Sequence, residues 1–356
     1  MQKQQRYEVI GVAQGLAINY TYAPARKFLA HFRQCVLRPE AESACGEHLR
    51  RLLREQLHDA YFGNRVDSLH TLQVSLNEIL SRRFSRTGDH VERSPFMFEM
   101  QQQIIEAQLR TDLQGIAGES MPESADAFKR WFDDRARPSI YPVHPLFDFI
   151  EEHASFEQFR RFIAVEAGVH VSFDDVIALA QVGVRGSVKS EFLRNLRDEA
   201  GDDDPERFHL SMFEHLVGGL GIGPIYRCTL PSAALACGSY MMFLAHFRNY
   251  YGYCVGYLGI LEALTPARFG CIARGGARLG IASELLEYHT EHSVLDTDHA
   301  HGWLHNIILP TILEHGAQMS REIAIGVRLR ERVAQRYWDA MLAELTTHPQ
   351  LTWGQG

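Results

Sequence analysis

The sequence predicts an all-α protein, and three observations lead to this fold class. Apolar residues recur at three- and four-residue steps in segments such as 26–37 (RKFLAHFRQCVL) and 68–84 (SLHTLQVSLNEILSRRF), which is the period of an amphipathic helix. The apolar–polar alternation that is typical of strands is nearly absent. Several helical segments exceed four turns, the length that a helical bundle requires.

Breaks in this pattern divide the chain into two parts. A loop is expected over residues 115–124 (GIAGESMPES), and three prolines within 137–145 (RPSIYPVHP) stop any helix. We therefore predict a helical N-terminal region over residues 1–137 and a helical core over residues 138–356. The N-terminal segments carry apolar stripes but no cluster of metal ligands, which favours a role in packing, in dimerisation as a homodimer, or as a lid.

The core is expected to be built from helices of unequal length. Their predicted ranges are 156–169, 176–183, 187–200, 208–221, 239–264, 282–319 and the segment that follows residue 320.

Composition and charge exclude several classes of function. Hydrophobic residues make up 46% of the chain, enough for a sizeable core, and the formal charge of −8 argues against binding to nucleic acid or to an anionic membrane. The first residues lack the features of a signal peptide, and no apolar run approaches the length of a transmembrane helix. The six cysteines form no CxxC pair, which is typical of reduced thiols. We therefore expect a soluble, cytoplasmic protein.

The strongest chemical signal is the segment YHTEHSVLDTDHAHGWLH. His292, Asp296 and His299 stand at i, i+4 and i+7, so on a helix they share a sector of about 60°. Two imidazoles and a carboxylate on one face suit iron, manganese or zinc. The alternative is a solvated, charge-rich helix face, because other polar residues crowd the same segment: Glu287, Glu291, Asp298 and His301.

A second signal is the segment LRDEAGDDDPERFHLSMF. Glu199 falls at the end of one predicted helix and His209 at the start of the next, with a break over 201–205. Such a loop lets two ligands ten residues apart reach one site, which a continuous helix would not allow. The alternative is that these acidic residues only cap a helix and interact with its dipole.

Two further carboxylates lie in apolar helices. Glu262 follows an aromatic and apolar run, where a carboxylate is costly unless it is paired or binds a metal. Glu166 is placed similarly in RFIAVEAGVHV, with solvent exposure as the alternative. The stripe of Gly252, Gly256 and Gly259 either permits close helix packing or leaves room for a substrate.

Three carboxylates and three imidazoles are a suitable complement for two divalent irons. Four positive charges then meet three negative ones, leaving about +1 before oxygen or hydroxide binds. Carboxylates stabilise ferric iron, whereas histidines hold ferrous iron, so this set can cycle between the two oxidation states.

These residues resemble those of the haem-oxygenase-like diiron oxidases and oxygenases, often labelled iron-containing redox enzymes. The resemblance covers about residues 144 to 312, and the Glu-x9-His and His-x3-Asp-x2-His elements are specific in combination. The sequence DDDP stands where relatives more often have a glycine-containing loop. The matching stretches are HPLFDFIEEHAS, RFIAVEAGVHVSFDD, KSEFLRNLRDEAGDDDPERFH, YGYCVGYLGILEALTPARFG and RLGIASELLEYHTEHSVLDTDHAHGWLHNIILP.

The resemblance implies a haem-oxygenase-like helical bundle core that holds two Fe ions (Fe2+/Fe3+) and uses O2 as co-substrate through a peroxo-diferric intermediate. It implies no catalytic side chain beyond the metal ligands. Family members perform N-oxygenation, oxidative decarboxylation or carbon–carbon cleavage, often on amino-acid-derived small molecules in natural-product biosynthesis. The ligands implied are Glu199, His209, Glu262, His292, Asp296 and His299, with Glu166 as a further carboxylate.

Two other functions stay open on the sequence alone. One is a cofactor-free hydrolase on the same fold, similar to thiaminases and using a cysteine, and the other is a non-catalytic protein that binds iron or a small ligand. Basic and aromatic residues of the core could contact a substrate. The candidates are Arg194, Arg248 and Arg274 for a substrate carboxylate, and Tyr250, Tyr251, Tyr253 and Tyr257 for the wall of a pocket.

Overall fold

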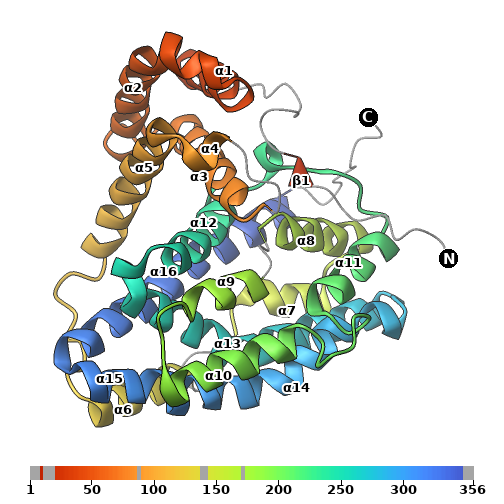
Figure 1. Ribbon diagram of the computed structural model, residues 1–356. Helices are drawn as coiled ribbons and strands as arrows, with labels where there is room; N and C mark the ends of the chain where they lie inside the picture. Colours follow the sequence, from red (N-terminus) through yellow and green to blue (C-terminus); the bar gives the residue numbers. More distant parts are fainter. Residues whose placement is uncertain (1–8, 11–20, 86–89, 137–142, 170–172, 348–356) are drawn as a thin grey trace.

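The prediction of an all-helical protein is confirmed by the computed structural model (Figure 1). The structure describes residues 9–10, 21–85, 90–136, 143–169 and 173–347, apart from the side chains of residues 9–10, 39, 43–45 and 295–297. Within these ranges the only strands are β1 (Val9–Ile10) and β2 (Ile225–Tyr226), which pair in parallel.

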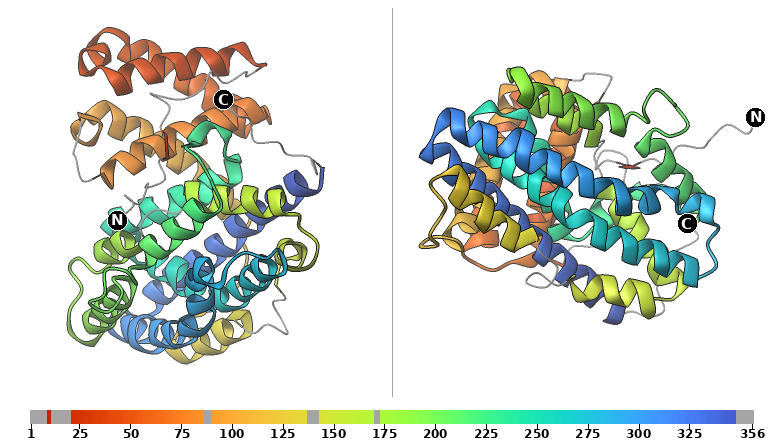
Figure 2. Two further views of the ribbon diagram at one scale, coloured as in Figure 1. Left: turned by 90° about the vertical axis from the view of Figure 1, so that its right-hand side faces the viewer. Right: turned by 90° about the horizontal axis from the view of Figure 1, so that it is seen from below.

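The helices within residues 23–114 form a layer above the core, as the left view of Figure 2 shows. Helices α1, α2, α3 and α5 pack against one another, whereas α6 packs against α13, α15 and α16 of the core. The loop expected over residues 115–124 lies between α5 and α6. The N-terminal helices are α1 (Ala23–Leu37), α2 (Pro39–Tyr61), α3 (Val66–Arg83), α4 (His90–Arg93), α5 (Pro95–Gln114) and α6 (Ala125–Ala136).

The core helices surround α13, which packs along both α14 and α16. Helix α12 lies between the core and α3 of the N-terminal layer (Figure 1). The core helices are α7 (Pro145–Glu152), α8 (Phe156–Val169), α9 (Phe173–Ala180), α10 (Gly186–Glu199), α11 (His209–Gly219), α12 (Ser232–His246), α13 (Tyr251–Arg278), α14 (Glu287–Gly302), α15 (Leu309–His315) and α16 (Ala317–Thr347).

Glycines allow α13 and α16 to approach closely. A Cβ added at Gly256 would overlap the carbonyl oxygen of Ile323 on α16, and one added at Gly326 would overlap the carbonyl oxygen of Tyr253 on α13. The two helices therefore meet backbone to backbone at this crossing. Of the two functions considered for the glycine stripe, the structure supports close helix packing.

The prediction of a single helix over residues 239–264 was wrong. The chain leaves the helical conformation at Phe247 (φ −109°, ψ 111°), a short 3-10 turn follows, and α13 then begins at Tyr251. Helix α13 also continues through Pro266 to Arg278, so Glu262 lies in mid-helix and not near its end. Proline lacks an N–H, so Pro266 cannot donate the usual helical hydrogen bond to the carbonyl of Glu262.

The helix predicted over residues 282–319 begins at Glu287 and contains a π-helical turn. Residues Trp303–Ile308 form this turn between α14 and α15, and Gly316 (φ 79°) ends α15. Such turns insert one extra residue into an α-helix and are frequent beside functional sites. Here the turn begins four residues after His299.

A buried ion pair links the N-terminal layer to the core. Arg227 follows β2, and its Nη1 donates to Oε2 of Glu78 on α3 at 2.6 Å. The Nε of Arg227 also donates to Oδ1 of Asn77 at 2.7 Å. Both charged side chains are buried. One hydrophobic core runs through both parts of the chain, from Ala25 to Leu345. The division at residue 137 stays a prediction.

No helix among the described residues is long and apolar enough to cross a membrane. The cysteines whose side chains are described are all free thiols: Cys35, Cys228, Cys237, Cys254 and Cys271.

We predict that Glu78→Ala lowers the free energy of unfolding by about 3–5 kcal/mol, because it leaves the Arg227 guanidinium buried without its counter-ion. Urea denaturation measures this change. The matched control is Glu123→Ala, which breaks an exposed pair with Arg321 and should cost less than about 1 kcal/mol. Equal effects of the two substitutions would contradict a role for the buried pair in joining α3 to the core.

Candidate metal centre

Three buried side chains from three helices form a cluster that could hold a metal ion. Glu199 ends α10, His209 begins α11, and His292 lies in α14. One ligand atom from each lies within 4.8 Å of the other two. The Nδ1 of His209 is 2.8 Å from Oε2 of Glu199, and the rings of His209 and His292 are 4.2 Å apart at their centroids.

The loop between α10 and α11 brings Glu199 and His209 face to face. Gly201 adopts φ 74°, and a Cβ there would overlap the backbone of Asp204 and Phe208. Asp202 (φ 52°) and Asp203 (φ 76°) are also left-handed, a conformation that aspartate tolerates better than most residues. Arg197 pairs with both aspartates, at 2.8 and 3.0 Å. The DDDP sequence therefore makes a tight reversal that places His209 opposite Glu199.

Glu262 and His299 form a second pair in the same region. The Oε2 of Glu262 is 3.7 Å from Nδ1 of His299, and both side chains are buried. The Oε1 of Glu262 has no hydrogen-bond partner among the described residues. A buried carboxylate oxygen without a donor is costly unless a cation binds it. The Oε1 of Glu262 therefore has the surroundings expected of a carboxylate oxygen that binds a metal ion.

Hydrogen bonds fix the orientation of two of the histidines. Nδ1 of His292 lies 2.7 Å from the carbonyl oxygen of Tyr288, and Nε2 of His299 lies 3.0 Å from Oδ2 of Asp198. If these nitrogens carry the protons, the other ring nitrogen of each histidine keeps a lone pair for a metal. Carboxylates and carbonyls orient metal-binding histidines in this way.

The charges of the cluster are perturbed by burial. Burial, with the neighbouring His209, lowers the pKa of His292 to about 3, so the ring is neutral and able to ligate metal. Burial raises the pKa of Glu199, but the hydrogen bond and the charge of His209, together with His292 and His299, outweigh it, and the net pKa lies below the ordinary value. Burial, aided by the nearby Glu199, keeps the pKa of Glu262 above its ordinary value despite the neighbouring His299. Bound cations would reduce the electrostatic repulsion between Glu199 and Glu262.

The alternative of a solvated helix face at α14 does not hold for its two described ligand candidates. His292 is only 5% exposed and His299 only 2%. Asp296 lies in α14, but its side chain is outside the described residues. Imidazole nitrogens and carboxylate oxygens are a donor set that iron accepts, so the residues present fit the metal that the resemblance implies.

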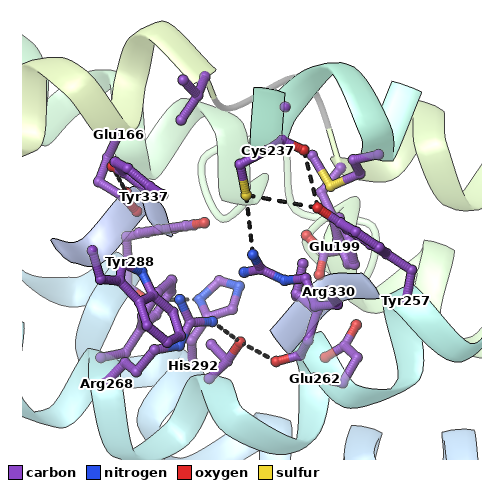
Figure 3. Close-up of a pocket in the computed structure, with 18 residues that line it drawn as sticks. Glu166, Glu199, Cys237, Tyr257, Glu262, Arg268, Tyr288, His292, Arg330 and Tyr337 are labelled. Atoms are coloured by element: carbon purple, nitrogen blue, oxygen red, sulfur yellow. Dashed lines mark hydrogen bonds between the residues drawn. The ribbon is translucent and has the colours of Figure 1, made fainter. Parts of the chain in front are cut away.

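Glu166 lies apart from the three-residue cluster. It is buried, so solvent exposure does not explain it, and its Oε1 accepts a hydrogen bond from the hydroxyl of Tyr337. Figure 3 shows the pair Glu166–Tyr337 on one side of a cavity and Glu199 and Glu262 on the other. The role of Glu166 as a ligand stays a prediction.

Glu199, Glu262 and His292 line a cavity of about 80 Å³, as does Glu166 (Figure 3). Its walls are largely apolar and aromatic, as is usual for small-molecule sites. The polar groups that face it, besides Glu166, Glu199, Glu262 and His292, are Cys237, Tyr257, Thr265, Arg268, Tyr288, Arg330 and Tyr337.

Several polar residues of the cavity were not predicted from the sequence: Cys237, Thr265, Arg268, Tyr288, Arg330 and Tyr337. A signal was present for one of them, because Arg330 interrupts the apolar stripe that Ile323 and Val327 begin on α16. The three arginines proposed for a substrate carboxylate lie elsewhere. Of the four tyrosines proposed for the pocket wall, Tyr257 lines this cavity.

Those three arginines have other partners. Arg194 donates to Glu191 at 3.0 Å and lines a wider surface cavity on the other side of His209 and His299. Arg274 makes a bidentate pair with Glu151, at 2.6 and 2.8 Å. Arg248 donates to backbone carbonyls, including that of Ala180.

An all-helical core with buried carboxylates and imidazoles directed at one another is typical of proteins that hold redox metals between helices. Residues 160–335 match the model of a protein family described as iron-containing redox enzymes. This segment includes every ligand candidate, and over it the resemblance is confirmed. No curated protein matches the chain.

We predict that anaerobically loaded protein binds up to two ferrous ions per chain, and that His292→Ala or Glu262→Ala weakens iron binding at least tenfold, on the order of the loss known for disturbed metal sites. Metal analysis and Mössbauer spectroscopy measure both. His301→Ala is the matched control: His301 is exposed on the same helix, so this variant should bind iron as the unchanged protein does. One tightly bound zinc and no iron would contradict the assignment.

We also predict that α14 is less protected than α3 from hydrogen exchange without iron, and that iron loading closes the gap. Helix α14 is rich in residues of low helix propensity, such as Thr290, His292 and Ser293, so metal ligation should hold it. Binding to the folded form alone adds about 2.7 kcal/mol at a hundredfold excess over Kd. Equal, strong protection of α14 in both states would show that the site is preformed.

Proposed function

We propose that this protein is a non-haem diiron enzyme that uses dioxygen to oxidise a small, amino-acid-derived substrate. The observation that carries the proposal is the buried cluster of Glu199, His209 and His292 beside the pair Glu262–His299, within a segment of an iron-containing redox enzyme family. These five side chains supply two groups of nitrogen and oxygen donors, enough to hold two irons with Asp296 added.

In this proposal the protein's own residues bind the metal ions, orient the histidine rings and keep water away from the site. Glu199, His209 and His292 would hold one iron, and Glu262 and His299 the other. Asp198 and the carbonyl of Tyr288 orient the rings. A bound pair of ferrous ions supplies the electrons that reduce dioxygen. The apolar and aromatic residues of the cavity next to the ligands would limit the access of bulk water and so limit side reactions.

The reaction that we propose is N-oxygenation, or oxidative decarboxylation with carbon–carbon cleavage, in natural-product biosynthesis. All of these need a substrate held beside the metals and no nucleophilic side chain. The cavity fits this need, because it adjoins Glu199, Glu262 and His292 and combines apolar and aromatic residues with polar groups that could orient a substrate.

One observation favours the cofactor-free hydrolase as a second candidate. The thiol of Cys237 faces the same cavity, 3.7 Å from the hydroxyl of Tyr257, and accepts a hydrogen bond from Arg330 at 3.0 Å. A hydrolase of this kind has no need of buried Glu199, His209 and His292, which is why we rank it second.

We predict that the diferrous protein consumes dioxygen in a single turnover, oxidising two ferrous ions for each two-electron reduction of O2. An oxygen electrode and a ferrous-iron assay measure the two quantities. Glu262→Ala and His299→Ala should abolish the reaction, because each removes a donor to the metals. The control His301→Ala should react as the unchanged protein does.

Cys237→Ser separates the two candidates. Oxygen consumption should persist in this variant, whereas a hydrolase that uses this thiol would lose its activity. A protein that binds two irons, reacts with oxygen once and never turns over with any amino-acid-like substrate would instead be an iron-binding protein, and the enzymatic proposal would be wrong.

A further inference from the structure

A buried guanidinium faces the cavity without a carboxylate to neutralise it. Arg330 projects from α16 and is only 6% exposed. Among the described residues no carboxylate oxygen lies within 4 Å of its nitrogens; its contacts there are with a thiol and aromatic rings. Arginine is almost never fully buried unless it is paired.

The groups that touch Arg330 hold it in place but do not cancel its charge. Nη1 donates to Sγ of Cys237 at 3.0 Å (Figure 3). The guanidinium lies 5.5 Å from the ring centroid of Tyr257 and 5.9 Å from that of Trp338. Cation–π contacts of this kind are weak compared with an ion pair. Burial lowers the pKa of Arg330, but Cys237, Tyr257 and Glu166 outweigh it, so the guanidinium stays protonated.

The other arginine of the cavity is differently placed. Arg268 donates to the carbonyl of Leu264 at 3.1 Å and to the hydroxyl of Thr265 at 2.7 Å, both on its own helix. It also lies 5.3 Å from the ring centroid of Trp338. Two cationic side chains thus face a cavity whose carboxylates are Glu166, Glu199 and Glu262.

The charge balance of this cavity depends on the metals. Without them, the three carboxylates outweigh the two guanidiniums. Two ferrous ions add four positive charges and make the loaded cavity net positive, even with one more carboxylate from Asp296. A low-dielectric cavity with net positive charge favours an anionic ligand.

We propose that Arg330 binds the carboxylate of the substrate, with the hydroxyl of Tyr257 beside it. The inference rests on the proposed function for one feature: the opposite end of the substrate then points toward Glu199 and Glu262, where the chemistry would occur. The planar guanidinium pairs with a carboxylate in a bidentate manner, which fixes orientation as well as position.

The test uses pairs of probes that differ only in the charged group. Calorimetry on anaerobic diferrous protein compares each common L-amino acid with its carboxamide, and butanoate, hexanoate and octanoate with their amides. We expect at least one acid to bind about tenfold to a hundredfold more tightly than its amide, the range of a hydrogen bond to a charged group. The amino-acid and fatty-acid arms tell the two sources of a carboxylate apart.

Arg330→Met should reduce this acid-to-amide ratio to within about twofold, since methionine fills the space without a charge. Arg274→Met is the matched control: it removes an arginine outside the cavity and should keep the ratio. If Arg330→Met does not fold, Arg330→Lys decides the question, because it keeps the charge, loses the bidentate pair and should lower the ratio severalfold.

Two results would overturn the inference: no acid preferred over its amide in the unchanged protein, or a preference that survives loss of Arg330. Iron content is measured on the same samples, so the two proposals fail separately. Iron bound without an acid preference removes the role of Arg330 alone. An acid preference that depends on Arg330 in protein that binds no iron removes the diiron function and leaves the carboxylate site standing.

Discussion

The close approach of α13 and α16 sets the geometry on which the site depends. Where Gly256 and Gly326 cross, each helix offers its backbone in place of a side chain, so the axes approach more closely than larger residues would allow. This crossing brings Glu262 and Tyr257 of α13 into one cavity with Arg330 and Tyr337 of α16. A larger residue at either glycine would push the two helices apart and so move Glu262 farther from Arg330.

Electrostatics gives this arrangement its chemical character. Glu199 and Glu262 are both buried, and their pKa values move in opposite directions because His209 stabilises the charge of the first while burial opposes that of the second. Two carboxylates whose environments push their pKa values apart are a frequent mark of a functional site. The same volume contains a neutral His292 and a charged Arg330. The two guanidiniums of the cavity therefore do not fully offset its three carboxylates.

Much of the fold could be predicted from the sequence, since helical periodicity is a local signal. The positions of Glu199 at a helix end, of His209 at a helix start and of His292 and His299 on one helix all follow from spacing. The break at Phe247 could not be read this way, because the apolar pattern runs through it unchanged. Sequence periodicity also gave no reason to expect α13 to continue past Pro266.

The substrate side of the site was harder to predict than the metal side. Ligands to a metal recur at spacings fixed by the helix, whereas Cys237, Arg268 and Arg330 come from three helices and meet only in the folded chain. Arginines are numerous, and only its place in the apolar stripe of α16 distinguishes Arg330, which is buried, from Arg274, which pairs with Glu151 at the surface. Burial without a counter-ion is a property of the tertiary structure alone.

The π-helical turn Trp303–Ile308 has a consequence for how the ligand helix can change over evolution. Each residue added to an α-helix rotates the rest of the helix by about 100°, so the extra residue sets the register of α15 independently of that of α14. Ile308 contacts α13 at Gly259, while Trp303 donates to Asn195 of α10. Deleting one residue from this turn would restore a regular helix and rotate Ile308 away from α13. His292 and His299, which precede the turn, would keep their positions. Because of this turn, mutations can change how α15 packs against α13 without changing the spacing of His292 and His299 on α14.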